Sequence, residues 1–156
     1  MEELINRGIE NGLISFNEDK SRIIYYTKPQ TKSYKYSDPE EKVRAIVFLQ
    51  LIFNYGYPIN RIQLEVQVPR RTPNDFADIV VFNDDECKSP FIVVECKHKD
   101  VSEQEFIQAI EQGFGNTNSL KAHYLVVTSI IKKLYYNVAD FKTMERIANR
   151  IPDIPH

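Results

Sequence analysis

Two apolar runs that carry acidic residues at one end place the strongest constraint on how this chain folds. Residues 75–82 read Asp-Phe-Ala-Asp-Ile-Val-Val-Phe, and residues 91–97 read Phe-Ile-Val-Val-Glu-Cys-Lys after a polar loop. Short runs that are rich in β-branched residues and bounded by polar segments predict neighbouring, largely buried strands. An acidic side chain in such a strand loses its hydration, which is costly unless a cation or a hydrogen-bond donor lies beside it. The two runs therefore predict a sheet with a polar site at one end.

Three charged side chains are expected to meet at that end of the sheet. Asp78 stands where the first strand begins, and Glu95 and Lys97 close the second. Side chains alternate between the two faces of a strand, so Glu95 and Lys97 should share one face while Cys96 points to the other. Two carboxylates with an ammonium group beside them predict a site for a hard divalent cation.

A helix is expected before these strands and another after them. Residues 37–41, with a capping side chain, a proline and two acids, predict the start of a helix that continues to about Tyr55. Ser102 followed by Glu105 predicts a second helix start, and that helix should end within residues 115–118. The other expected elements are a short helix at 2–10, strands at 23–26, 62–68 and 124–128, an exposed loop at 28–37, an edge strand at 133–136 and a helix at 141–149.

The order of these elements predicts an α/β fold with a central mixed β-sheet flanked by α-helices. A helix leads into a strand meander, and a crossover helix then leads into a further strand. The length of 156 residues suits one domain, and the composition, 42% hydrophobic and 27% charged, is that of a folded protein. No apolar run reaches the roughly 18 residues of a membrane span, so no membrane partner is expected. Two cysteines are too few for a disulfide framework, which favours a cytoplasmic location.

The order and spacing of the motifs resemble a known family. Glu95-Cys96-Lys97 follows Asp78 at the spacing of the PD-(D/E)XK nuclease signature. Together with the helix start at 39–44 and with Gln112, these motifs resemble the N-terminal nuclease domain of type I restriction enzyme R subunits over residues 36–130. The resemblance implies a restriction-endonuclease-like fold. It also implies a Mg²⁺-dependent endonuclease domain, with Mn²⁺ able to replace Mg²⁺, that hydrolyses DNA in a restriction-modification system.

The resemblance assigns roles to the charged residues at the sheet end. Asp78, Glu95 and Lys97 are expected to be catalytic, and Lys97 would orient the attacking water and stabilise the charge that develops on the phosphate. Asp78, Glu95 and the backbone carbonyl of Cys96 are the expected metal ligands. Mg²⁺ bound there would polarise phosphoryl oxygens and lower the pKa of its bound water.

Two further positions carry expectations from the family. An acid at the start of the first helix faces the metal in the family, and both Glu40 and Glu41 are candidates, with Glu40 favoured; complementing the helix dipole is the alternative role for either. Gln112 matches the glutamine of a Gln-x-x-x-Tyr motif and is either catalytic or a solvent-facing helix residue. Asn116 stands where the family has tyrosine, which leaves the partner of Gln112 open.

The expected partners are DNA and the motor or methyltransferase domains or subunits of a restriction-modification complex. The expected division of the chain is an N-terminal extension at 1–35, the nuclease domain at 36–150 and a tail at 151–156 that leads to further domains. A motor does not fit in 156 residues, so the chain is expected to be a fragment or a stand-alone relative, and its C-terminal prolines favour a fragment.

Two alternative functions remain open from the sequence. A catalytically silent nuclease-fold module could serve in DNA binding or subunit docking, and the departure at Asn116 favours it mildly. A nuclease for RNA or for junctions would carry the same core motif. The net charge of −2 indicates that this domain alone holds DNA weakly, because nucleic-acid-binding domains are usually basic.

Overall fold

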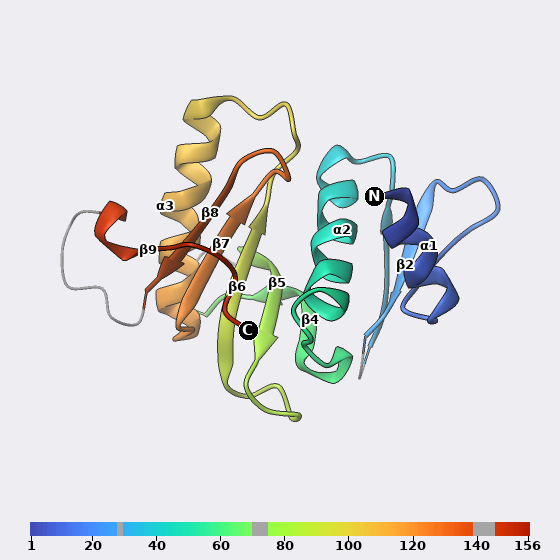
Figure 1. The fold of residues 1–156 in the computed structure, drawn as a ribbon, viewed down its shortest axis with the longest axis horizontal. Helices are drawn as coiled ribbons and strands as arrows, with labels where there is room; N and C mark the ends of the chain where they lie inside the picture. The colour runs from blue at the N-terminus through green and yellow to red at the C-terminus, as the bar shows by residue number, and fades with distance from the viewer. Residues whose placement is uncertain (28–29, 70–74, 139–145) are drawn as a thin grey trace.

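A computed structural model describes residues 1–27, 30–69, 75–138 and 146–156, and these residues form two β-sheets with helices around them (Figure 1). The α-helices are α1 (Glu2–Glu10), α2 (Pro39–Phe53) and α3 (Glu103–Leu120), and the short 3₁₀ helices are η1 (Ile59–Arg61) and η2 (Arg146–Asn149). The strands are β1 (Ile14–Phe16), β2 (Arg22–Tyr26), β3 (Thr31–Lys35), β4 (Ile62–Gln67), β5 (Phe76–Phe82), β6 (Pro90–Cys96), β7 (Tyr124–Thr128), β8 (Lys133–Asn137) and β9 (Arg150–Ile151).

The larger sheet is mixed, and helices lie on both of its faces. Its strand order is β4-β5-β6-β7-β8-β9, with β6 and β7 parallel and the other neighbours antiparallel. The parallel pair needs a crossover connection, and α3 supplies it. The predicted α/β class with a central mixed sheet flanked by helices is therefore confirmed. No helix in the described part of the chain is both long and apolar enough to cross a membrane.

Helix α2 lies between the two sheets, as Figure 1 shows, and this position explains its sequence. A helix with one covered face has an apolar stripe, whereas α2 is apolar around most of its circumference. Phe48, Leu49 and Leu51 are fully buried, in one core with Ile23 and Tyr25 of the smaller sheet. Helix α3 covers the opposite face of the larger sheet and builds a second core.

Local signals account for where the two main helices begin. The side chain of Asp38 accepts a hydrogen bond from the backbone N–H of Glu40, and Pro39 occupies the first turn of α2. The hydroxyl of Ser102 accepts from the backbone N–H of Glu105 over 3.1 Å at the start of α3. Both predicted helix starts are confirmed.

Several element predictions need correction. The predicted exposed loop at 28–37 contains strand β3, in which half-buried Lys32 and Tyr34 alternate with exposed residues and pair with β2; residues 28 and 29 lie outside the described part. Helix α3 continues to Leu120, beyond the predicted end at 115–118, because Lys121 caps it in the left-handed conformation at φ 61°.

The C-terminal predictions differ from the structure in a similar way. The predicted edge strand at 133–136 is flanked on its outer side by β9, which pairs with Tyr135 and Tyr136. Of the predicted helix at 141–149, residues 141–145 lie outside the described part and residues 146–149 form η2. A two-residue strand such as β9 has too short a pattern to be found by periodicity, since it forms only through its partner.

Candidate active site

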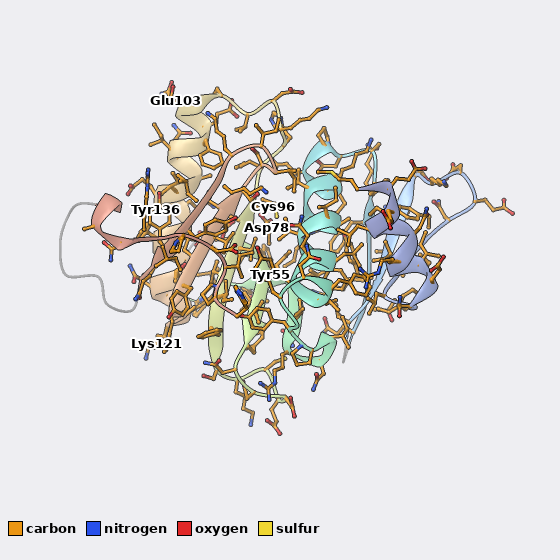
Figure 2. All side chains as sticks on the ribbon, viewed as in Figure 1. Tyr55, Asp78, Cys96, Glu103, Lys121 and Tyr136 are labelled. Atoms are coloured by element: carbon orange, nitrogen blue, oxygen red, sulfur yellow. The ribbon has the colours of Figure 1, made fainter. Side chains whose placement is uncertain are left out.

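Asp78 and Glu95 lie next to each other where the ladder between β5 and β6 ends. The paired residues reach Ile79 and Val94, and Asp78 and Glu95 are the next residue on each strand. The backbone N–H of Cys96 donates to Asp78 Oδ2 over 2.7 Å, which holds the carboxylate against β6. Figure 2 shows Asp78 and Cys96 beside each other near the centre of the molecule. The structure thus brings together the two acids that the sequence placed on separate runs.

Burial favours the protonated form of both carboxyl groups. The pKa of Asp78 is raised to about 6, because burial outweighs the hydrogen bond from Cys96 and the attraction of nearby cationic side chains. The pKa of Glu95 is raised well above its usual range, first by burial and then by the charge of Asp78, against a hydrogen bond from Asn116. In the protein alone, the positive charge nearby is therefore insufficient to offset the lost hydration of two adjacent carboxylates.

Helix α3 directs two side-chain amides at acids of the sheet. Gln112 Nε2 donates to Asp75 Oδ1 over 3.2 Å, and Asn116 Nδ2 donates to Glu95 Oε1 over 3.0 Å. The two amides share one side of the helix because they are four residues apart. Gln112 is exposed and Asn116 is fully buried. Asn116, the residue that departs from the tyrosine expected at this position, therefore contacts a candidate catalytic acid directly.

Gly113 allows α3 to approach the sheet closely enough for these contacts. A Cβ atom at this position would lie 2.7 Å from Leu125 Cδ1 and 3.3 Å from Glu95 Cγ. The first distance is shorter than real Cβ contacts allow, so any larger residue would force α3 or Leu125 to move. The close approach of α3 depends on the absence of a side chain here.

Lys97 reaches across to the start of α2. Its Nζ lies 3.7 Å from Glu40 Oε2, and its backbone N–H donates to the carbonyl of Thr128 over 2.9 Å. Glu95 therefore contacts α3 while Lys97 contacts α2, although alternation along a strand placed them on one face. Lys97 is the first residue after β6, and it reaches Glu40 with the end of its long side chain. The side chain of Lys97 is 33% exposed, which leaves it accessible to a substrate.

Glu41 belongs to a different, buried cluster. Its carboxylate accepts hydrogen bonds from the hydroxyl of Tyr25 and from two nitrogens of Arg44. Arg44 also lies 3.4 Å from Glu65, a strand residue in the left-handed conformation at φ 49°, and stacks over the ring of Tyr34. Burial opposes the charge of Arg44, yet its bonds to Glu41 outweigh burial and raise its pKa. Of the two candidate acids at the start of α2, Glu40 is the one beside Lys97.

The sequence analysis did not predict Asp75 or Arg44 as residues of this region, and it singled out Asn116 without its contact to Glu95. Asp75 is buried beside Gln112, Asn116 contacts Glu95, and Arg44 joins Glu41 to Glu65. Helical spacing gave a partial signal, since Glu41 and Arg44 are three residues apart and Gln112 and Asn116, four apart, share one side of α3. Nothing in the sequence indicated which strand residues those helix faces meet.

The donor atoms at the sheet end suit a hard cation. Within the described residues, no three His, Cys, Asp or Glu side chains group together to hold a metal ion. Mg²⁺ does not require such a group, because it keeps several waters and is commonly bound through one or two carboxylates and substrate phosphates. Asp78 and Glu95 supply two adjacent carboxyl groups, and burial raises the pKa of both.

One protein family matches most of the chain. The family model described as the type I restriction enzyme R protein N terminus matches residues 39–155. The matched segment begins with α2, contains Asp78, Glu95 and Lys97, and leaves out α1 and the three-stranded sheet. No curated protein and no solved structure gives a significant match.

Proposed function

Because this chain belongs to the family of type I restriction enzyme R protein N termini, we propose that it is a Mg²⁺-dependent endonuclease domain that hydrolyses DNA in a restriction-modification system. The family supports the restriction-modification role. The chemistry of hydrolysis is proposed from the residues at the sheet end. The proposed partners are DNA and the other domains or subunits of a restriction-modification complex, acting in the cytoplasm.

The pair of adjacent, buried carboxyl groups carries this proposal. Asp78 and Glu95 meet at the end of β5 and β6, and the pKa of each is raised by burial. Such a pair lowers the stability of the fold, since two buried like charges repel each other. A divalent cation would relieve both the burial and the repulsion. We propose Asp78, Glu95 and the Cys96 carbonyl as its ligands, with Glu40 beside them and acting through water.

The chain's own side chains would then divide the remaining work. Hydrolysis joins a water oxygen to phosphorus and breaks one P–O ester bond, and the proton that the water loses is balanced by the proton that the leaving alkoxide oxygen takes up. Lys97, paired with Glu40 and partly exposed, would orient that water and stabilise the charge on the phosphoryl oxygens. Gln112 is proposed to contribute from α3, where its amide contacts Asp75. Bound Mg²⁺ supplies polarisation of the phosphate and a lower pKa of its water.

A catalytically silent module for DNA binding or subunit docking is the second candidate. The observation that favours it is Asn116, which stands where the family has tyrosine and touches Glu95. The two candidates predict different effects of Lys97→Ala on DNA nicking. A nuclease should lose this activity, whereas a silent module needs no ammonium group beside its carboxylates.

The test combines calorimetric titration of Mg²⁺ and Mn²⁺ with nicking of supercoiled plasmid. We expect wild type to bind metal and to nick DNA with Mn²⁺. Asp78→Asn should lose at least tenfold in metal affinity, and Lys97→Ala should keep metal binding but lose at least a hundredfold in nicking rate, as expected for loss of charge stabilisation in the transition state, about 10²–10³-fold.

Matched controls separate these effects from general damage. Lys99 and Asp100 are exposed residues close to Lys97 in the chain, and Lys99→Ala and Asp100→Asn should leave both measurements unchanged. Metal binding without nicking in wild type would favour the silent module or a need for the proposed partners. Absence of metal binding in wild type would overturn the proposed function.

A further inference from the structure

The buried contact between Asn116 and Glu95 has no role in the function proposed so far. Asn116 is fully buried on α3, and its Nδ2 donates to Glu95 Oε1 over 3.0 Å. Glu95 is itself buried, so the bond lies away from solvent. The amide therefore engages one defined oxygen of the carboxylate, Oε1.

The second polar atom of the same amide argues against a purely structural role. Asn116 Oδ1 is buried and has no hydrogen-bond partner within the described part of the chain. A buried polar atom without a partner costs about 1–3 kcal/mol, so packing alone would favour an apolar side chain of the same size. The amide at this position is explained by what its nitrogen does for Glu95.

The surroundings make this contact rigid. Gly113, one turn before Asn116, lets α3 lie against Glu95 and Leu125, and the neighbouring Thr117 is also fully buried. A side chain in such a setting has little freedom to choose another rotamer. Asn116 is thus able to hold the carboxylate of Glu95 in one orientation.

We propose that Asn116 is a positioning residue that fixes Oε1 of Glu95 and thereby presents Oε2 to the divalent cation. The inference rests on the proposed function, since it concerns the same metal site. Partners that hydrogen-bond a ligating carboxylate orient it, and their loss commonly costs 10- to 100-fold in metal affinity. Asn116 does not touch the cation or the reacting atoms in this proposal.

The test is calorimetric titration of Mn²⁺ into Asn116→Leu, a variant of similar size that lacks the donor. We expect its affinity for Mn²⁺ to fall 10- to 100-fold below that of wild type. The control is Thr117→Val on the same helix, which removes the hydroxyl that donates to the carbonyl of Gly113 over 2.7 Å but leaves Glu95 untouched. Its affinity should stay within about twofold of wild type, as for a residue that does not orient a ligand.

The outcomes separate this inference from the function on which it rests. Unchanged Mn²⁺ affinity in a folded Asn116→Leu, with binding in wild type, would overturn the inference and leave the proposed function standing. No Mn²⁺ binding in wild type would overturn both. Circular dichroism checks the fold, and Asn116→Ala replaces Asn116→Leu if the leucine is not accommodated. Failure of both variants to fold would show the amide to be structural and would also overturn the inference.

Discussion

At the scale of single residues, the site depends on how closely α3 lies against the sheet. Gly113 is the residue that permits the approach, because a Cβ there would meet Leu125 and Glu95. Asn116 uses the same approach to reach Glu95. One missing side chain thus controls the surroundings of a candidate metal ligand.

Replacing Gly113 with alanine tests this dependence. Alanine gains about 1 kcal/mol in helix propensity over glycine, whereas overpacking a buried contact costs about 1–3 kcal/mol. We expect the cost of overpacking to exceed the gain in helix propensity, because Leu125 is fully buried and its Cδ1 would lie only 2.7 Å from the new Cβ. Gly113→Ala should lower the free energy of unfolding by about 1 kcal/mol, measured by urea denaturation.

A double variant provides the control for that measurement. Leu125→Val removes both Cδ atoms that a Cβ at residue 113 would meet. The combination of Gly113→Ala with Leu125→Val should therefore be less destabilised than the sum of the single variants. Additive effects would mean that the two side chains do not meet.

At the scale of elements, the three-stranded sheet is part of the support of α2. It lies outside the segment that the family match covers, yet Tyr25 of β2 packs edge-on against Phe48 at 5.2 Å and bonds Glu41 with its hydroxyl. Arg44 completes the cluster, and Tyr34 of β3 covers it. An N-terminal segment that was predicted as an extension therefore holds the helix on which Glu40 lies.

Removing the hydroxyl of Tyr25 should weaken this support. In Tyr25→Phe the buried carboxylate of Glu41 keeps Arg44 but loses one donor, and hydrogen bonds to charged groups contribute about 1.5–3 kcal/mol. We expect the free energy of unfolding to fall by about 2 kcal/mol. Tyr26→Phe is the control, since Tyr26 is exposed and its hydroxyl shares a hydrogen bond with the neutral hydroxyl of half-buried Ser15. Equal effects of the two variants would contradict a special role for the Tyr25 hydroxyl.

At the scale of the whole molecule, the candidate site lowers the stability of the metal-free protein at neutral pH. The ordinary pKa of an aspartate is 3.8, and that of folded Asp78 is about 6. The folded chain therefore holds this proton more tightly than the unfolded chain. The contribution of Asp78 favours folding below about pH 4 and is lost as the pH rises through 6, since the buried carboxylate must then ionise.

Asp78→Asn tests this dependence on pH. The variant keeps an oxygen for the N–H of Cys96 but carries no charge, so at pH 7.5 it should be more stable than metal-free wild type, by an amount on the order of 2 kcal/mol. The difference should shrink as the pH falls from 6 towards 4. Urea denaturation at several pH values measures it, and added Mg²⁺ should stabilise wild type but not the variant.

An exposed aspartate supplies the control with the opposite sign. The pKa of Asp85 is lowered by the hydrogen bond and charge of Arg61, so its ionised form favours the folded state. Asp85→Asn should therefore not gain stability at pH 7.5. If both variants gained stability, loss of any negative charge would stabilise this chain. The gain in Asp78→Asn would then not be due to removal of a buried carboxylate.

Local features of the sequence were sufficient for the starts of α2 and α3, for strands β4 to β8 and for the candidate acids. Asp38 and Ser102 cap their helices through bonds to neighbouring residues, and Asp78 and Glu95 stand out because acids are costly in apolar strands. These signals lie within a few residues of the structure that they predict. The fold class followed from the order of the elements alone.

Only the tertiary structure decided which side chains meet. Which of the two glutamates lies beside Lys97 depended on Tyr25, a residue of another sheet that binds Glu41, and the partner of Asn116 depended on the packing of α3 at Gly113. Strands β3 and β9 form through hydrogen bonds to neighbours and carry weak patterns of their own. Contacts of this kind join residues far apart in the chain, and the free energy that selects them comes from burial and pairing in the assembled fold.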